Sequence, residues 1–290
     1  MRIPPAAPDA SFAELVLDDD GPAARRFRST TALSFMERLD ARGLAEVRCS
    51  ASAQPSVAAF EDVRRRLPGV PPEALYVVDL RQESHGFVDG AAVSWYARSN
   101  WGAAGLSAEE ALALESLRLR LLSLAETVRI GNVESVKRGA PRTLVERTGA
   151  RITHEVEAFG LDAGRYLRLP VTDHTRPSDA AVDRFAAFLR DLDGEGHVHL
   201  HCRGGKGRTA TFMALADMLH NAAHLSLPEI LARQARLNEY ELTKAPDPAS
   251  AKAPYIAERR AFLERFHAYA RANPMGAPLR WSEWTQRPAG

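Results

Sequence analysis

Apolar residues recur with two different periods along this chain of 290 residues. Short runs rich in apolar residues and bounded by turn residues are typical of buried strands. Longer stretches with an apolar residue at every third or fourth position are typical of amphipathic helices. The expected strands span 44–50, 74–80, 165–171 and 197–201, and the expected helices span 57–67, 177–192, 209–219, 228–238 and 254–271.

The remaining segments are less regular. Residues 1–24 are rich in Pro, Ala and Asp and are expected to be a flexible lead-in, whereas 86–105 are expected to form a long ordered loop. Glycine-punctuated segments from 127 to about 164 predict small antiparallel strands. Ser107 and Glu110 form a capping box that opens a further helix, and one face of that helix carries Ala111, Leu114, Leu117, Leu121 and Leu124.

Composition narrows the class of protein. An apolar content of 45% is normal for a globular enzyme, and the length leads us to expect an insert or a subdomain. The net charge of +1 argues against the broadly basic surface of a nucleic-acid-binding protein. No apolar run is long enough to span a bilayer, and neither end carries a lipidation motif. The N-terminus lacks an apolar signal core, so we expect a periplasmic or secreted protein if a signal peptide has been removed, and a cytoplasmic one otherwise.

The run 201–209 carries the most specific pattern, with the order His-Cys-Arg-Gly-Gly-Lys-Gly-Arg-Thr. It follows an expected strand and precedes an expected helix. A glycine-rich loop in that position makes an anion site, because its backbone N–H groups and the helix N-terminus point at the ligand. Both features stabilise a thiolate, so Cys202 is expected to ionise easily. The planar fork of Arg208 suits two phosphate oxygens.

These parts predict covalent catalysis on a phosphate ester. The Cys202 thiolate would attack phosphorus, while the loop amides and Arg208 would hold the oxygens on which transition-state charge spreads. Thr209 is placed to donate a hydrogen bond to the sulfur, and His201 is expected to order the loop rather than to transfer protons.

Two other interpretations of the same stretch stay open. A lone cysteine is usually a small buried hydrophobic residue, which is the alternative for Cys202 and the role that we expect of Cys49. A reversible bridge between Cys49 and Cys202 is a further alternative. His197, His199 and His201 share one face of the strand with the spacing of metal ligands. A zinc site, however, needs neither the glycine loop nor the arginine.

A leaving alkoxide needs a proton, so a general acid is expected elsewhere in the chain. Asp173 is the best candidate because it falls in the loop after the expected strand 165–171. In a parallel sheet, the loops at the carboxyl ends of the strands line the ligand crevice, so this loop and the cysteine loop are expected to face one pocket. The alternative is that Asp173 or Ser178 merely caps the next helix.

The motif at 201–209 and Thr-Asp-His-x-x-Pro at 172–177 together resemble the protein-tyrosine-phosphatase-like phytases, also called cysteine phytases. The segments 79–86, 92–96 and 281–284 match that family as well. The resemblance implies an α/β, protein-tyrosine-phosphatase-like fold with a mainly parallel central sheet flanked by helices. It also implies a phosphatase domain at 25–290 with a small β-barrel-like subdomain inserted at about 125–164, which deepens the pocket.

The family hydrolyses the phosphate esters of myo-inositol hexakisphosphate stepwise, without a metal or other cofactor. By resemblance, Cys202 is the nucleophile, Arg208 binds the reacting phosphate and Asp173 is the acid. Arg176 departs from the family, which usually has a tryptophan there that anchors closure of the acid loop by packing. An arginine could instead reach an anionic ligand.

A substrate with several phosphates, each carrying about −1.5 to −2 charges at neutral pH, needs several cations. Among the candidates, Arg81 is the expected phosphate contact, Arg28 matches a substrate-reaching segment of the family, and Glu83 and His85 are expected mainly to support the loop. Gln234 is a candidate for orienting the attacking water. The full set of expected substrate-binding residues is Arg203, Gly204, Gly205, Lys206, Gly207, Arg81, Arg28, His174, Glu83, His85 and Lys252.

The leading hypothesis is a metal-independent phosphatase for inositol polyphosphates, with a small polyanionic substrate and no nucleic-acid or membrane partner. The alternatives are a phosphatase for phosphotyrosine or inositol lipids, and a catalytically idle module that binds inositol phosphates. The oligomeric state stays open.

Overall fold

The computed structural model describes residues 1–5, 13–32, 39–138, 145–192 and 194–287. Its centre is a five-stranded sheet in the order β10-β4-β11-β3-β2. Every neighbouring pair is parallel except β2 with β3, which confirms the predicted mainly parallel sheet. The strands are β2 (Arg28–Ser29), β3 (Cys49–Ala53), β4 (Leu75–Arg81), β10 (Tyr166–Val171) and β11 (His197–Cys202).

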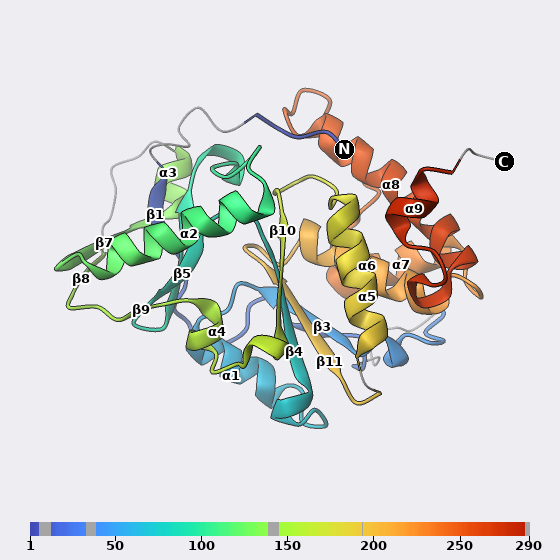
Figure 1. Cartoon of the computed structure of the whole chain (residues 1–290), viewed down its shortest axis with the longest axis horizontal. Helices are drawn as coiled ribbons and strands as arrows, with labels where there is room; N and C mark the ends of the chain where they lie inside the picture. Colours follow the sequence, from blue (N-terminus) through green and yellow to red (C-terminus); the bar gives the residue numbers. More distant parts are fainter. Residues whose placement is uncertain (6–12, 33–38, 139–144, 193, 288–290) are drawn as a thin grey trace.

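One face of this sheet is covered by the C-terminal helices, which lie to the right of the central strands in Figure 1. Helix α6 is the innermost, because it is apolar nearly all round and packs against β3, β11, α7 and α8. It therefore starts inside the molecule, directly after the end of β11. The helices are α5 (Asp179–Asp191), α6 (Gly207–Asn221), α7 (Leu227–Asn238), α8 (Ala253–Ala272) and the short α9 (Trp281–Thr285).

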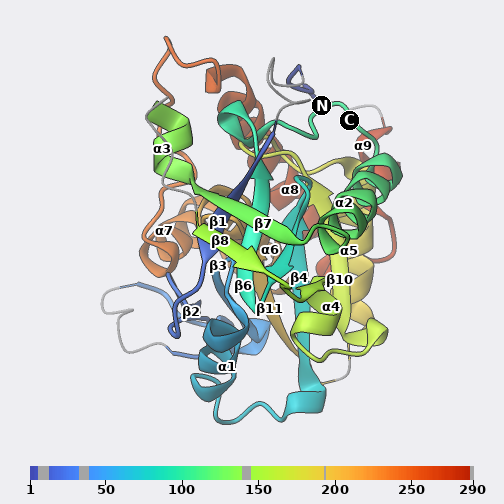
Figure 2. The same ribbon diagram turned by 90° about the vertical axis from the view of Figure 1, so that its left-hand side faces the viewer.

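The other face is covered by α1 (Val57–Arg65) and by a second sheet, seen from the front in Figure 2. This sheet has the strand order β8-β7-β1-β6-β5-β9. Its strands are β1 (Glu14–Asp19), β5 (His85–Val88), β6 (Ala91–Tyr96), β7 (Thr127–Asn132), β8 (Val145–Thr148) and β9 (Ile152–Thr153), and α2 (Ala108–Ser123), α3 (Val133–Arg138) and α4 (Glu155–Ala158) accompany it.

The second sheet corrects two expectations about chain organisation. The subdomain expected at about 125–164 supplies β7, β8 and β9, but β1, β5 and β6 belong to the same sheet. The expectation of a flexible lead-in at 1–24 is wrong for Glu14–Asp19, because these residues pair with β6 and β7 and bury Val16. Residues 6–12 of that lead-in lie outside the described residues.

Two further boundaries differ from the prediction. The expected loop at 86–105 contains most of β5 and all of β6, which form a hairpin around Asp89 and Gly90. Both turn residues have positive φ, +50° and +81°, as a tight two-residue hairpin turn requires. The strand expected at 44–50 begins only at Cys49, because the preceding residues form a short 3-10 turn at Ala45–Val47.

Helix α2 has the predicted capping box, but the predicted face is wrong. Its buried residues are Ala111, Glu115 and Leu119, whereas the stripe that includes Leu117 and Leu121 is exposed. On the buried face, the Glu115 carboxylate pairs with Arg168 of β10 at 3.0 Å. Within the described residues, no helix combines the length and the apolar character needed to cross a bilayer.

Candidate active site

The loop between β11 and α6 has the strand–loop–helix form that the sequence predicts. Gly205 is its tightest point: φ is +62°, and a Cβ there would lie 2.5 Å from the backbone nitrogen of Ala53. The end of β3 also supports the loop through the Gln54 N–H, which donates to the Arg203 carbonyl at 3.2 Å. Only glycine lets the loop lie this close to β3.

Cys202 ends β11 and lines the cavity with its side chain 3% exposed. The Thr209 hydroxyl donates to Sγ at 3.0 Å, so the expected contact with the sulfur is present. Cys49 pairs with Val198 at the start of β11, whereas Cys202 pairs with Ala53. The two thiols therefore lie at opposite ends of one strand pair, which rules out a bridge between them in this fold, and burial raises the pKa of Cys49 to about 12.

Arg208 lies at the start of α6 and is held by carboxylates. Its two terminal nitrogens form a bidentate pair with Glu83 at 2.7 and 2.9 Å, and Nη2 lies 3.4 Å from the Asp173 carboxylate. Burial acts to lower the pKa of Arg208, but Asp173 and Glu83 outweigh it and raise the pKa well above its usual value. Glu83 thus fixes the guanidinium beside Cys202 rather than contacting the cavity.

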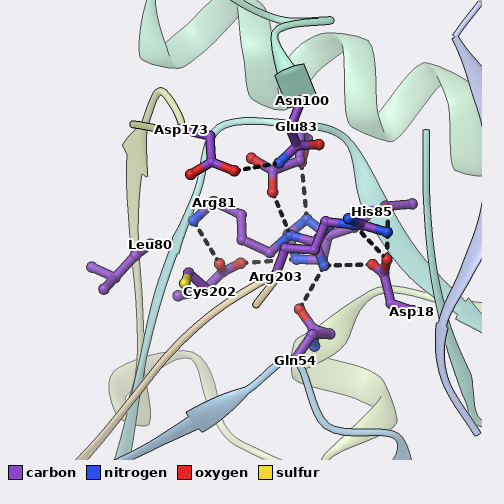
Figure 3. Close-up of polar contacts among 12 residues, drawn as sticks. Asp18, Gln54, Leu80, Arg81, Glu83, His85, Asn100, Asp173, Cys202 and Arg203 are labelled. Atoms are coloured by element: carbon purple, nitrogen blue, oxygen red, sulfur yellow. Dashed lines mark hydrogen bonds and ion pairs between the residues drawn. The ribbon is translucent and has the colours of Figure 1, made fainter. Parts of the chain in front are cut away.

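Asp173 lies in the loop after β10 and lines the same cavity as Cys202. Asn100 donates to its carboxylate at 3.2 Å, and the Trp101 indole donates to its backbone carbonyl at 3.0 Å. Burial acts to raise the pKa of Asp173, but Arg208, His174 and the Asn100 hydrogen bond together lower it. Figure 3 shows Asp173 joined to Asn100 near Glu83.

The two loops face one cavity of about 300 Å³. Of the predicted substrate-binding residues, those that line it are Arg203, Gly204, Lys206, Gly207, His174 and Lys252. The sequence reasoning missed its other walls, which are Tyr96, Ser99, Asn100, Lys137 and Tyr240. Lys137 belongs to no motif, and it lies on α3, which directly follows β7 of the second sheet.

Arg81, the expected phosphate contact, does not line the cavity. Its guanidinium is fully buried and pairs with Asp18 at 2.9 Å and Glu83 at 3.0 Å, and it donates to Gln54 at 2.9 Å, as Figure 3 shows. Asp18 on β1 also holds the guanidinium of Arg203 at 2.8 Å. Arg81 and Asp18 therefore position the loop from behind, and the opposite charges at short distance explain why Arg81 lies inside the molecule.

Arg28 also lies outside the cavity wall. Two of its nitrogens donate to the Asn238 side chain at 3.0 and 2.8 Å. Burial lowers its pKa to about 10, while the nearby Cys202 acts in the opposite direction. Gln234, the candidate for orienting the attacking water, is buried as well: it donates to Asp217 and does not line the cavity.

His85 and His201 belong to a buried ionic network beneath the loop. His201 Nε2 lies 2.6 Å from Glu155, and His85 Nε2 lies 2.9 Å from Asp79. The Asp79, Glu155 and His201 ligand atoms lie within 4.8 Å of one another, a spacing that suits a metal ion. The Arg168 guanidinium, however, lies 2.8 Å from Asp79, so a cation already balances these carboxylates.

The histidine triplet does not act as one ligand set. His199 contacts the hydroxyls of Ser50 and Ser52 at 3.0 Å, and His197 contacts Ser50 at 3.0 Å. Burial lowers the pKa of His197 to about 4 and that of His199 well below its usual value, so both rings are neutral. Serine hydroxyls satisfy these rings, whereas His201 pairs with a carboxylate instead.

Known proteins of similar sequence or structure group the chain with one family. The sequence model of the PTP-like phytase family, whose description names inositol hexakisphosphate, matches residues 78–220. A PTP-like phytase from Bdellovibrio bacteriovorus has 36% sequence identity and a TM-score of 0.78, over 99% of this chain and 98% of that one.

Other relatives are longer than this chain. The tandemly repeated protein tyrosine phosphatase like phytase from Mitsuokella multacida has 29% identity and a TM-score of 0.85, over 99% of this chain and 48% of that one. A PTP-like myo-inositol phosphatase from the same organism has been solved with myo-inositol-(1,3,4,5)-tetrakisphosphate. Effector protein hopD2 of Pseudomonas syringae pv. tomato is 33% identical over 264 residues, which are 89% of this chain and 56% of that relative's length. The match to the Bdellovibrio protein over almost the full length of both chains shows that this chain belongs to the PTP-like phytase family.

Proposed function

We propose that this protein hydrolyses the phosphate esters of inositol polyphosphates through a cysteinyl-phosphate intermediate. The observation that carries the proposal is the charge of the cavity wall. Lys137, Arg203, Lys206, Arg208 and Lys252 line it, and Asp173 is the one carboxylate among the described lining residues. A single phosphate needs one such cation, whereas a ring with several phosphates needs the others.

The reaction follows from the contacts around the sulfur. The Cys202 thiolate attacks phosphorus in line, the P–O ester bond breaks, and Asp173 gives its proton to the leaving alkoxide. Water then attacks the phosphorus of the cysteinyl phosphate and loses a proton to Asp173. The P–S bond breaks, and Thr209, which donates to Sγ, stabilises the departing thiolate.

Arg208 and the loop amides bind the charge that develops on the phosphoryl oxygens. Glu83 preorganises this site, because it pairs with Arg208 and does not itself line the cavity. Asp18 acts likewise on Arg203. These carboxylates hold the cations in place before a substrate arrives, so that little reorganisation is needed during the reaction.

Two neighbouring functions use the same nucleophile. A phosphotyrosine phosphatase needs only one phosphate site, and a lipid phosphatase needs a membrane-facing surface. The PTP-like myo-inositol phosphatase whose structure holds an inositol tetrakisphosphate supports the soluble polyphosphate instead. The similarity to an effector protein keeps a phosphoprotein substrate as the main competitor.

The number of phosphates that the site senses can be measured directly. In Lys206→Gln we expect KM to rise severalfold for inositol hexakisphosphate, because one charged contact is lost, and to change little for p-nitrophenyl phosphate. Lys244→Gln is the matched control, since Lys244 lines a different cavity. An equal effect of Lys206→Gln on both substrates would contradict the polyphosphate assignment.

A further inference from the structure

The family tryptophan of the acid loop is replaced by Arg176, and the structure shows what this arginine contacts. The loop crosses from the end of β10 to the start of α5 (Figure 1) and carries Asp173 near its beginning and Arg176 near its end. The Arg176 side chain is 12% exposed and does not line the cavity. The suggestion that it reaches an anionic ligand at the active site is therefore wrong.

Arg176 instead packs between α5 and α8, in a contact site that we call its seat and that consists of Asp179, Glu258 and Phe262. Nη1 donates to the Asp179 carboxylate of α5 at 2.8 Å and to the Pro177 carbonyl at 2.9 Å. Nε donates to Glu258 of α8 at 3.3 Å, and the guanidinium lies over the Phe262 ring at 5.5 Å from its centroid. The face of the guanidinium thus takes the aromatic contact, while its edge takes two carboxylates.

The carboxylates of this seat are themselves fixed. The Trp281 indole donates to Asp179 Oδ1 at 2.8 Å, and the backbone N–H of Arg2 donates to Glu258 at 3.0 and 2.8 Å. A guanidinium bound to fixed partners in a partly buried place loses little further freedom and holds its own backbone in register. Only His174 and Thr175 separate that anchored backbone from the general acid.

We propose that Arg176 is a positioning residue for the general acid: its seat between α5 and α8 anchors one end of the Asp173 loop, while Asn100 and Trp101 anchor the other. This inference rests on the proposed function and adds to it an explanation of how Asp173 is held in position. An ionic and aromatic seat replaces tryptophan packing. Because the seat is separate from the cavity, it affects Asp173 without affecting phosphate binding.

The leaving group provides the test. An alkoxide needs the proton of Asp173, whereas p-nitrophenolate leaves almost without help. In Arg176→Met, which keeps a side chain over Phe262 and removes the charge, kcat/KM is expected to fall on the order of tenfold for glycerol 2-phosphate and inositol hexakisphosphate. For p-nitrophenyl phosphate kcat/KM is expected to change by less than about twofold, because that ester needs little acid catalysis. The test uses kcat/KM because kcat also contains hydrolysis of the cysteinyl phosphate, in which Asp173 acts on every ester alike.

Two further variants separate positioning from folding. Glu258→Gln removes one carboxylate of the seat and is expected to give the same leaving-group pattern to a smaller extent, while Arg176→Lys restores part of the loss. Arg260→Met is the matched control, because Arg260 is an exposed arginine of α8 that pairs with the exposed Glu264 and does not border the separate cavity that Arg176 lines. Thermal unfolding of each variant shows whether its fold is intact.

The decisive comparison is Asp173→Asn with and without Arg176→Met. If Arg176 acts through Asp173, the double variant is no slower than Asp173→Asn alone. An additional loss in the double variant, or an equal loss on all three esters in Arg176→Met, would overturn the inference and leave the proposed function standing. A wild-type protein inactive on every ester would overturn the proposed function, and the inference with it.

Discussion

At the scale of single residues, the site is a set of charges held by other charges. Arg208 is shared between Glu83 and Asp173, and Arg203 is held by Asp18. The sequence indicated Cys202, Arg208 and Asp173, because a glycine-rich run and a conspicuous Asp-His-x-x-Pro have few other uses. It could not indicate that Arg81 pairs inward, because an arginine's partner depends on chain segments far away in sequence.

Glu83 is expected to matter for turnover although it does not line the cavity. In Glu83→Gln, Arg208 loses its bidentate carboxylate and can follow Asp173 instead, so kcat/KM is expected to fall about tenfold to a hundredfold. Steady-state kinetics with inositol hexakisphosphate measures this. Glu157→Gln is the matched control, since its pair with Arg151 is exposed. An unchanged kcat/KM in Glu83→Gln would show that Arg208 needs no such support.

The proton of Asp173 sets the expected pH dependence. Against the effect of burial, its pKa is lowered in the ligand-free protein, chiefly by Arg208, so the carboxyl ionises at a lower pH than an ordinary aspartate. A phosphate dianion bound at Arg208 offsets that charge and acts to raise the pKa of Asp173. Because the acid works only when protonated, kcat for an alkyl ester is expected to fall as pH rises through the pKa that Asp173 has in the complex. Asp173→Asn should abolish this alkaline limb; a limb that persists in the variant would assign it to another group.

At the scale of elements, the loop after β11 works because it lies against the end of β3. The spacing of apolar residues predicted the strands and helices around this loop. The strands β4, β10 and β11 and the helices α5 to α8 begin and end close to the predicted positions. The hairpin of β5 and β6 was missed although Asp89-Gly90 is a strong turn signal. Its flanking segments, rich in small residues and aromatic residues, hid the alternation.

Two neighbouring glycines of the loop offer a matched pair of variants. In Gly205→Ala the new Cβ would meet the backbone of Ser52 and Ala53 at positive φ, so the loop must shift and kcat/KM is expected to fall on the order of a hundredfold. In Gly204→Ala the Cβ meets no atom within 4 Å, so the loop need not shift and the thermal unfolding midpoint is expected to change little. Kinetics and thermal unfolding of both variants test this; equal losses would contradict the close approach to β3.

At the scale of the whole molecule, two sheets meet behind the catalytic loop. β1 brings Asp18 to Arg203, and α4 brings Glu155 to His201, although both segments belong with the second sheet. The sequence could not reveal either contact, since Asp18 falls in a stretch that reads as a polar lead-in and Glu155 in a stretch of short irregular segments. Packing between distant segments, rather than local pattern, decides where such carboxylates lie.

This buried network predicts how stability depends on pH. Burial acts to raise the pKa of Glu155 and Glu115, but His201 for the first and Arg168 for the second, with their hydrogen bonds, lower both from 4.5 to about 2. Their stabilisation is therefore present above about pH 4.5 and lost as pH falls toward 2. Urea unfolding across this range should show a falling midpoint, less steeply in Glu155→Gln; identical slopes would contradict the network.

The central claim is that Cys202 attacks phosphorus in a polyphosphate ester and needs no metal to do so. The most direct measurement is phosphate release from inositol hexakisphosphate in excess EDTA, by the wild-type chain and by Cys202→Ser. The account predicts release that persists in EDTA and disappears in the serine variant. Release that stops in EDTA, or that survives the loss of the sulfur, would contradict it.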